Sequence, residues 1–519
     1  MTRIPAVLAI ALAAFPSFSQ APAPDLGLPQ LPSLVLAHDT AAAVSAQSTL
    51  LAYHVYQGTI AQAYPQLDLS TTYSLAFSPD IKSQVLNPPL PAAEVDVQNQ
   101  GTHLLGAKLS VSQLLPTAGN IVLALEDTMS MSTVGSRTVG GSTTNPDPLY
   151  SQKPRFSLGL VQPLFLNGKL LDLDLFPATL RKAQLGYLAQ DLANQAQRNQ
   201  AVSQAAQIFL SIVQLRKGVA QSESALAVAE GNLAALQQNF SLGSIAEVDL
   251  LDAKIGLSRQ KQALAELRST LAKTERLLAH SLGRDTLEGL TLGDDIPVLD
   301  IAASRDEIAQ KALAGHPLIR AKGLSAEEKR VDDVLAGQQY AATFNLSLSL
   351  SPRYPFDAAN SPYTATDVGA SFADLFKDGA GQDYALSAGL TIRLFDGGKQ
   401  EQSRAGNRAL AAIADQGLIA QRQAVLDQLD LDLMQKAALE EKITLLEESV
   451  SLGEKRLANE RNLLARGKTT EREVAAKRAD SEARANELWR ARADLLLTVL
   501  DLYSLAGEDL AKTIEGTRK

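Results

Sequence analysis

The sequence predicts a membrane β-barrel joined to a long α-helical coiled-coil barrel, with two internal repeats in each chain. Three observations predict this fold class. Two stretches of about 65 residues each contain helix-forming residues without a break, far longer than ordinary globular helices. Four short segments alternate apolar and polar side chains with a period of two. The N-terminus has the features of an export signal.

The N-terminus predicts a signal peptide of residues 1–19. Arg3 precedes an apolar stretch that is about ten residues long, which is too short to span a bilayer. Small residues follow, so we expect cleavage after Ser19 or Ala21 and export of the mature chain from the cytoplasm. A buried N-terminal helix is the alternative interpretation. The proline-rich stretch 22–32 is expected to be an extended arm.

Composition excludes several classes of protein. Of 519 residues, 45% are hydrophobic and only 5% are aromatic, and the formal net charge of −9 argues against binding to nucleic acid. The absence of cysteine excludes disulfides, thiolate metal sites, a catalytic thiol and a lipid anchor on an N-terminal cysteine. The five histidines lie too far apart to suggest a metal site, and no catalytic motif is present. We therefore expect no enzyme activity, no metal and no cofactor.

The chain repeats one plan twice. Leu242-Gly243-Ser244 resembles Arg466-Gly467-Lys468, and the separation between these two segments also relates Asp249 to Glu473 and Gly283 to Gly507. Three ordered landmarks at one separation are difficult to explain by chance. Each half follows the order strand, strand, long helix, turn, shorter helix.

The strand segments show where the two halves differ in length. Leu67 aligns with Phe344, and Leu164 aligns with Leu394. The distance in sequence from Leu164 to Leu394 is shorter than the distance from Leu67 to Phe344. The first half therefore contains about 47 extra residues, within the polar region 81–148. The predicted divisions are a first repeat over residues 20–283, a linker over 284–303 and a second repeat over 304–519.

The long helices are predicted over residues 175–239 and 400–466. At about 1.5 Å per residue, each would span roughly 100 Å. Alanine is frequent in them, and small side chains let helices approach closely, which suits a thin helical wall better than a globular core. This composition also accounts for the shortage of aromatic residues.

The return helices, predicted over residues 246–281 and 470–505, would cover only about 60 Å each. A further helix must therefore complete the return path alongside each long helix. We expect residues 308–339 to do so in the first half and residues 34–61 in the second. The N-terminal helix would then stack end to end on the C-terminal return helix.

Four segments of about ten residues alternate as barrel strands do, beginning at Leu67, Phe156, Phe344 and Tyr384. A soluble antiparallel sheet with one wet face is the alternative. Four strands cannot close a barrel, but three copies of four would give 12. Residues 106–114 and 120–131 also alternate, around a turn at Pro116, and predict an additional hairpin whose place in or above the barrel stays open.

The chain resembles the outer-membrane efflux protein family, the TolC family, over almost the whole mature chain. The resemblance is carried by Gln162-Pro-Leu-Phe-Leu-Asn-Gly, Leu394-Phe-Asp-Gly-Gly and Phe240-Ser-Leu-Gly-Ser-Ile-Ala-Glu-Val-Asp-Leu-Leu-Asp-Ala. It implies a homotrimer with a 12-stranded barrel in the outer-membrane lipid and a helical tunnel in the periplasm. Such a protein is the passive, gated exit duct of a tripartite efflux or type I secretion system. Its partners are a periplasmic adaptor and an inner-membrane pump that is proton-driven or ATP-driven.

The resemblance also assigns candidate residues. The adaptor-contacting tips would be Leu242, Gly243 and Ser244 in one turn, and Arg466, Gly467 and Lys468 in the other. The periplasmic gate would contain Asp249 and Glu473, which a trimer would arrange as rings of negative charge that favour cations. Each candidate has a structural alternative: the glycines as helix C-caps, the acids as helix N-terminal residues favoured by the dipole.

The chain departs from the family pattern at several positions. A second acid after Glu473 is missing, because Ala476 stands there, and Thr469 replaces a gating arginine. Tyr340 begins the segment where the family has a proline. The gate would therefore be held differently. Two other interpretations remain: a secreted or periplasmic coiled-coil protein without a pore, and an adhesin-like surface protein that exposes residues 135–148. The sequence does not identify a transported substrate.

Overall fold

The structure, a computed structural model, consists of two compact units. It describes residues 25–78, 81–85, 93–139, 141–145, 147–165, 169–288, 290–301, 303–337, 340–353, 356–358, 372–373, 375–376 and 381–516. The predicted signal peptide lies outside the described residues. We call residues 50–189 and 323–417 the sheet unit, and residues 1–49, 190–322 and 418–519 the helical unit.

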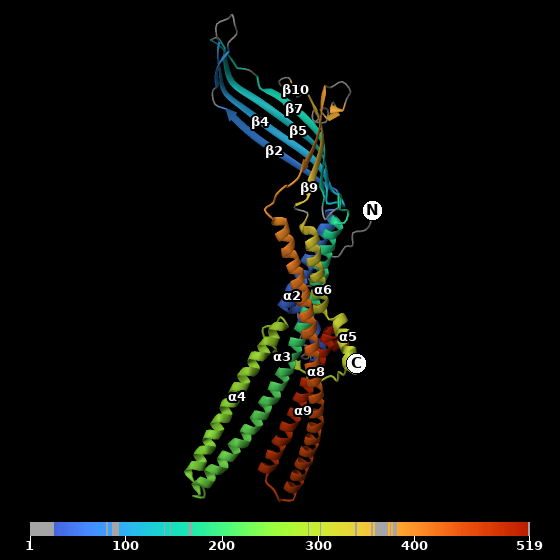
Figure 1. Ribbon diagram of the computed structural model, residues 1–519. Helices are drawn as coiled ribbons and strands as arrows, with labels where there is room; N and C mark the ends of the chain where they lie inside the picture. Colours follow the sequence, from blue (N-terminus) through green and yellow to red (C-terminus); the bar gives the residue numbers. More distant parts are fainter. Residues whose placement is uncertain are drawn as a thin grey trace. The chain divides into compact units, whose positions relative to one another are not determined.

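The sheet unit contains a single antiparallel sheet (Figure 1). Its main strands follow the order β11-β9-β7-β5-β4-β2, and the short strands β10, β3 and β6 pair with β7, β4 and β5. The bounds are β2 (Gln66–Ser78), β3 (Ile81–Val85), β4 (Ala93–Leu114), β5 (Asn120–Val139), β6 (Ser142–Thr144), β7 (Leu149–Leu164), β9 (Ala342–Pro352), β10 (Phe356–Ala358) and β11 (Gln382–Thr391).

The additional hairpin lies inside this sheet. Its strands β4 and β5 pair with each other, β4 pairs with β2 on one side, and β5 pairs with β7 on the other. The main sheet therefore has six long strands, which include the hairpin whose place the sequence left open. The hydrophobic alternation of residues 106–114 and 120–131 predicted the strands, but local alternation does not specify which strands pair.

The register aligns the apolar residues of all six strands on one face, which we call the apolar face. One row across the sheet consists of Leu69, Leu109, Leu125, Phe156, Leu350 and Tyr384. The neighbouring row consists of Leu67, Val111, Leu123, Leu158, Leu348 and Leu386. Between them, on the opposite face, lies a row of small or polar residues: Asp68, Ser110, Ala124, Ser157, Ser349 and Ala385.

The helices confirm the predicted pattern of long and short segments. Both long helices have 67 residues and both return helices have 35. The bounds are α1 (Leu31–His38), α2 (Thr40–Ala61), α3 (Leu175–Ser241), α4 (Glu247–Ser281), α5 (Arg305–Gly315), α6 (Pro317–Ala336), α8 (Lys399–Ala465), α9 (Glu471–Leu505) and α10 (Leu510–Gly516). Among the described residues, no helix combines the length and the apolar character needed to cross a membrane.

Within each of the two helical hairpins, an ion pair at a matching position links the return helix to the long helix. Arg268 of α4 contacts Glu223 of α3 at 2.6 Å, and Arg492 of α9 contacts Glu447 of α8 at 2.8 Å. Exposed ion pairs of this kind contribute little stability each. They instead fix the alignment of each return helix on its long helix.

The core of the helical unit is built mainly from aliphatic side chains. Leu31 and Val35 of α1 pack in one cluster with Val202 and Phe209 of α3 and with Ile514 of α10. Phe209 is the single aromatic residue among the largest fully buried side chains described. Close packing of alanine and other aliphatic side chains between the helices therefore forms the core, with few aromatic residues, as the composition predicted.

Two details of the N-terminal half differ from expectation. The stretch 22–32 was expected to be extended throughout, but α1 begins at Leu31, with Pro32 in its first turn, where proline is tolerated. The helix expected to stack on each return helix also differs, because the two short helical segments have exchanged partners. The end of α4 at Gly283 meets His38, and the end of α9 at Gly507 meets Gly315. The α1–α2 region therefore continues from α4, and α5–α6 continues from α9.

Candidate functional site

The turn between α3 and α4 is closed by backbone hydrogen bonds around a glycine. Gly243 has a φ of +72°, its N–H donates to the Phe240 carbonyl at 2.9 Å, and the Ser244 N–H donates to the Asn239 carbonyl at 3.0 Å. This is the pattern of a Schellman C-cap, in which the left-handed position suits glycine. Nothing lies within 4 Å of a Cβ added at Gly243, so the backbone conformation alone requires glycine there.

The turn between α8 and α9 has the same geometry. Gly467 has a φ of +70°, its N–H donates to the Leu464 carbonyl at 2.9 Å, and the Lys468 N–H donates to the Leu463 carbonyl at 2.9 Å. The predicted helix C-caps are therefore confirmed at both turns. This backbone geometry is the same whether or not a partner protein contacts the turns.

The two turns carry different side chains. The first exposes an apolar surface in which Leu242 is 74% exposed and Val248 65% exposed, flanked by Phe240, Leu251 and Ile255. The second turn is basic, because Arg466 and Lys468 are both exposed. A partner that contacted both turns would meet one apolar and one positively charged surface.

Asp249 lies in the first turn of α4, whose N-cap residue, Ala246, makes no side-chain hydrogen bond to the helix. The carboxylate is exposed, and no partner for it is found in the part of the chain that the structure describes. The helix dipole favours a negative charge at this position. Asp249 therefore presents an unengaged negative charge beside the first turn.

Glu473 occupies the equivalent position in α9, but its carboxylate is engaged. Thr470 caps the helix, its side chain accepts from the Glu473 N–H, and the Glu473 side chain accepts from the Thr470 N–H at 3.2 Å. Thr469 also donates its hydroxyl to this carboxylate, and that bond, followed by the bond from Thr470, lowers the pKa of Glu473. The structure gives Glu473 the structural role of a capping-box residue.

Thr469, which the resemblance predicts to replace a gating arginine, also lies 2.5 Å from a carboxylate oxygen of Glu460. A hydroxyl carries one proton, so it donates to one of the two carboxylates at a time. This link between the end of α8 and the start of α9 was not predicted from the sequence. The capping box itself was readable from Thr470-Glu471-Arg472-Glu473, since a threonine followed three residues later by glutamate marks a helix start.

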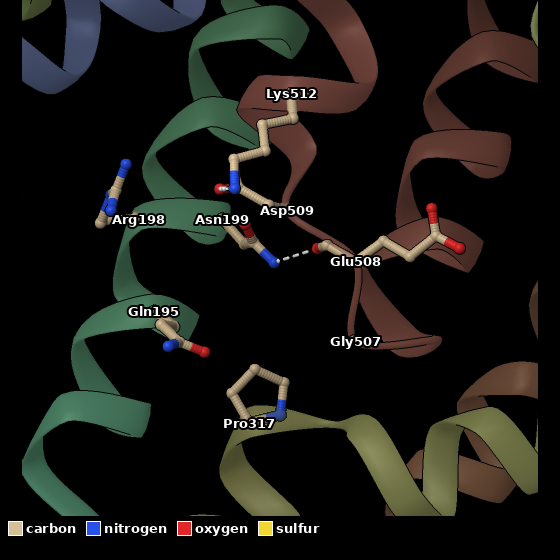
Figure 2. Close-up of a pocket in the computed structure, with 8 residues that line it drawn as sticks. All are labelled: Gln195, Arg198, Asn199, Pro317, Gly507, Glu508, Asp509 and Lys512. Carbon is tan, nitrogen blue, oxygen red and sulfur yellow. Dashed lines mark hydrogen bonds and ion pairs between the residues drawn. The ribbon is translucent and has the colours of Figure 1, made fainter. Parts of the chain in front are cut away.

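A cavity of about 310 Å³ lies in the helical unit, beside the loop that follows α9 (Figure 2). Asn199 of α3 donates to the Glu508 carbonyl at 2.8 Å and accepts from the Leu510 N–H at 3.2 Å. Arg198, Asp509 and Lys512 also line it. The side chain of Asn199 thus satisfies backbone groups that the loop leaves unpaired, which is a structural role.

Buried ionisable groups lie deeper in the helical unit. Asp432 of α8 is 4% exposed, accepts from Gln428 at 2.7 Å and keeps its second carboxylate oxygen without a hydrogen bond. Burial, opposed by the Gln428 bond and reinforced by the charge of Asp501, raises the pKa of Asp432 to about 6. Burial also raises the pKa of Asp501 and lowers that of His316.

The described residues include no group of three or more histidine, aspartate or glutamate side chains that could hold a metal ion. The predicted site residues thus fall into two helix turns with a similar backbone and different chemistry. Their arrangement suits contact with a macromolecule or an ion passing the turns.

Several solved structures with a similar fold are outer-membrane channels. The chain matches the CmeC outer membrane channel of Campylobacter jejuni with a TM-score of 0.61 and 12% identity, over 95% of this chain and 89% of that one. It matches CusC with a TM-score of 0.58 and 14% identity, over 94% and 95%. It also matches the open state of the MtrE outer membrane channel of Neisseria gonorrhoeae with a TM-score of 0.53 and 14% identity, over 95% and 94%.

No model of a known protein family and no curated protein sequence matches the chain. At 12% to 14% identity the structural matches concern the fold, and they confirm the predicted fold resemblance to outer-membrane channels of the TolC type.

Proposed function

We propose that this protein is an outer-membrane channel, the passive and gated exit duct of a tripartite efflux or type I secretion system. The apolar face of the sheet carries the proposal. Leu69 is 72% exposed, Leu386 71% and Tyr384 72% in the single chain. In water such a broad, regular apolar surface would promote aggregation, whereas in a bilayer it is the lipid-facing wall of a barrel.

The opposite face of the sheet suits a water-filled lumen. Asp68, Ser110, Ser157 and Ser349 lie in one row of it. Alternation of apolar and polar faces along every long strand is the pattern of transmembrane barrels. The solved channels of the same fold support this assignment.

The barrel is formed by a homotrimer. β2 and β11 are the two edges of the main sheet, and open edges in a bilayer leave backbone groups without hydrogen bonds. Pairing of β2 in one copy with β11 in the next satisfies both edges. The resemblance to TolC-type channels supports three copies.

The two repeats share one origin in this proposal. Helix α8 matches α3 in length, α9 matches α4, and one constant separation in sequence relates the bounds of both pairs at both ends. The same separation relates Gly243 to Gly467. Each half supplies one helical hairpin to a periplasmic tunnel.

The two turns bind a periplasmic adaptor, which links the channel to an inner-membrane pump. Leu242 offers an apolar anchor, and Arg466 and Lys468 offer positive charge. The pump supplies the energy, proton-driven or ATP-driven, because the channel is passive. The gate depends mainly on Asp249, because the capping box already holds the carboxylate of Glu473.

Cell fractionation tests the location. We expect the protein in the outer membrane as an oligomer that separates into monomers on heating. Recovery as a monomer in the soluble periplasmic fraction would contradict the channel and favour the pore-free coiled-coil protein.

Pull-down of a periplasmic adaptor encoded beside the channel tests the tip assignment. Leu242→Ser should weaken adaptor capture at least tenfold without changing the yield of oligomer in the outer membrane. Leu445→Ser is a matched control, because Leu445 is also well exposed, at 62%, but lies within α8 away from the turns. Equal capture by the Leu242→Ser and control variants would remove the first turn from the adaptor interface.

A further inference from the structure

We propose that the closed barrel has 18 strands, six from each of three copies, and that the β4–β5 hairpin forms part of the pore wall. This inference rests on the proposed function and changes the width of its exit. Three copies of the six-stranded main sheet give this number. The 12 strands expected from the sequence would require the hairpin to lie outside the wall.

The hairpin carries the same two faces as the rest of the sheet. Leu109 of β4 and Leu125 of β5 lie in register between Leu69 of β2 and Phe156 of β7. This row of the apolar face therefore continues through the hairpin. A hairpin that projected into water would have no physical reason to keep apolar residues aligned with its neighbours on one face.

Lys108 and Glu126 of the hairpin lie on the opposite face, whereas Asp127 lies on the same face as Leu125, where it is buried and accepts a hydrogen bond from Gln152. Lys108 of β4 is directly opposite Glu126 of β5, and Glu126 is directly opposite Arg155 of β7. These positions alternate with the apolar rows, so they face the lumen when the apolar residues face lipid. The hairpin thus adds a positive and a negative charge to the lumen at one level.

The lower turn of the hairpin is fixed to the sheet and to the start of a helix. The Thr117 hydroxyl donates to the Gln162 side-chain carbonyl at 2.7 Å, and both residues are buried. The Phe176 N–H of α3 donates to the Pro116 carbonyl at 3.2 Å. A Cβ added at Gly119 would clash with the Gln162 side chain, so the turn packs closely against β7.

The helices of the sheet unit lie in a row with one helix for each non-hairpin strand. Tyr53 of α2 contacts Tyr187 of α3 with ring centroids 5.6 Å apart. Further along the row, ion pairs include Arg181–Glu327 between α3 and α6, at 2.8 Å, and Arg330–Asp415 between α6 and α8, at 2.7 Å. The order α2, α3, α6, α8 follows the order of the strands β2, β7, β9, β11, to which these helices connect in sequence.

The hairpin strands β4 and β5 are joined by their own turn and continue into no helix. They are therefore inserted between β2 and β7, which widens the sheet without adding a helix. The trimer would combine 18 strands with the same number of long helical segments that four-stranded protomers would provide.

The two edge strands of the sheet can still pair between copies to close the barrel. β2 pairs antiparallel with β4, and each further neighbour in the main sheet is also antiparallel, so β2 and β11 run in opposite directions. An even number of strands thus lets β11 pair antiparallel with β2 of the next copy. The hairpin preserves this parity because it adds two strands.

The added strands enlarge the pore considerably. With strands about 4.8 Å apart and tilted by about 40°, a 12-stranded barrel has a radius of about 12 Å and an 18-stranded barrel about 18 Å. The cross-section of the outer-membrane segment therefore roughly doubles. Selection of cargo by size would then occur in the helical part of the duct.

Disulfide crosslinking in the full-length protein tests the strand order directly, since the chain contains no cysteine of its own. Directly opposed residues on neighbouring antiparallel strands have Cβ atoms close enough for a disulfide. The pair L69C/L109C should form a disulfide within one chain, as should L125C/F156C. The pair L69C/F156C should form none, because two strands separate these residues. Each single-cysteine variant serves as the control.

Electron cryomicroscopy of the trimer in lipid nanodiscs then counts the strands, with 18 expected. An efficient L69C/F156C disulfide, or a barrel of 12 strands with the hairpin outside it, would overturn the inference while leaving the outer-membrane channel intact. Absence of a membrane-bound trimer would instead overturn the proposed function. The two failures are therefore distinguishable.

Discussion

At the scale of single residues, Asp249 and Glu473 show how the same position acquires two different roles. Both are acids in the first turn of a return helix, at equivalent positions of the two repeats. Glu473 is bonded to Thr470 and Thr469, whereas Asp249 has no such partner among the described residues. The difference arises from the N-cap residue of each helix, since Thr470 has a side chain that can cap a helix and Ala246 does not.

We predict that Glu473→Ala destabilises the protein more than Asp249→Ala does. The first substitution removes half of a capping box and should lower the midpoint of thermal unfolding by roughly 1–2 °C, while the second should have almost no effect. Thermal unfolding followed by circular dichroism measures both. Equal changes in the two variants would contradict the structural role of Glu473.

Block of the channel by multivalent cations tests the gate. In a trimer, three copies of Asp249 would form a ring of unengaged carboxylates near the periplasmic turns, to which such cations bind. Asp249→Asn should weaken block by a multivalent cation in planar bilayers by about tenfold, and Glu473→Gln by much less. If Glu473→Gln had the larger effect, the gate charge would lie with Glu473.

The buried Asp432 predicts a pH dependence of stability. Its pKa is raised by burial to about 6, so the folded state favours the protonated form more than the unfolded state does. Stability should therefore increase as the pH falls from about 6 toward 4, and burial of the charge should cost stability above pH 6. Gln428 and Asp501 are the groups that face this carboxylate.

The substitution Asp432→Asn should raise the unfolding midpoint at pH 7.5 by roughly 1–3 °C. The gain should disappear near pH 4.5, where the wild-type carboxyl is already protonated in the folded state. A gain that was the same at both pH values would show that charge burial is not its cause.

At the scale of structural elements, each helical hairpin depends on a glycine at its turn. Gly243→Ala and Gly467→Ala should each destabilise the protein by about 1 kcal/mol, because alanine is strained at a φ near +70°. Gly256→Ala is the control. Gly256 lies within α4 with open space around it, so alanine should be neutral or stabilising by up to about 1 kcal/mol. Chemical denaturation compares the three, and a loss in the control alone would contradict this explanation.

The elements also show what the sequence could and could not predict. The ends of the long helices were predicted to within two residues, and the glycine turns mark where they finish. The strands were predicted because alternation is a local signal. The position of the hairpin between β2 and β7 was not predicted, because pairing partners depend on contacts distant in sequence, such as Thr117 with Gln162.

The candidate site was predictable to a similar extent. The two turns and both acids were located from the sequence, and Thr469 was recognised as a departure from the family. Its hydrogen bonds to Glu460 and Glu473 were not, because side-chain pairing across a turn depends on the geometry of both helices. The exchanged partners of α2 and α6 were not predicted either, because their similar lengths do not specify which return helix each one meets.

At the scale of the whole molecule, the sheet unit has exposed apolar residues and two open edges that the proposed assembly must cover. Much of the apolar face is exposed in the single chain, although Phe376 packs on Phe156, and β2 and β11 are the edges of the main sheet in the part of the chain that the structure describes. In the proposed channel, a bilayer would cover the exposed apolar residues, and two further copies would pair with both edges. The low aromatic content follows from this architecture, because most of the chain forms thin helical walls.

Reconstitution of the purified oligomer into planar lipid bilayers tests the central claim most directly. We predict discrete, water-filled channels from a protein extracted from the outer membrane, with block by multivalent cations that is reduced in Asp249→Asn. A protein that is recovered from the soluble periplasm and produces no conductance steps at any concentration would contradict the claim that this chain is an outer-membrane channel.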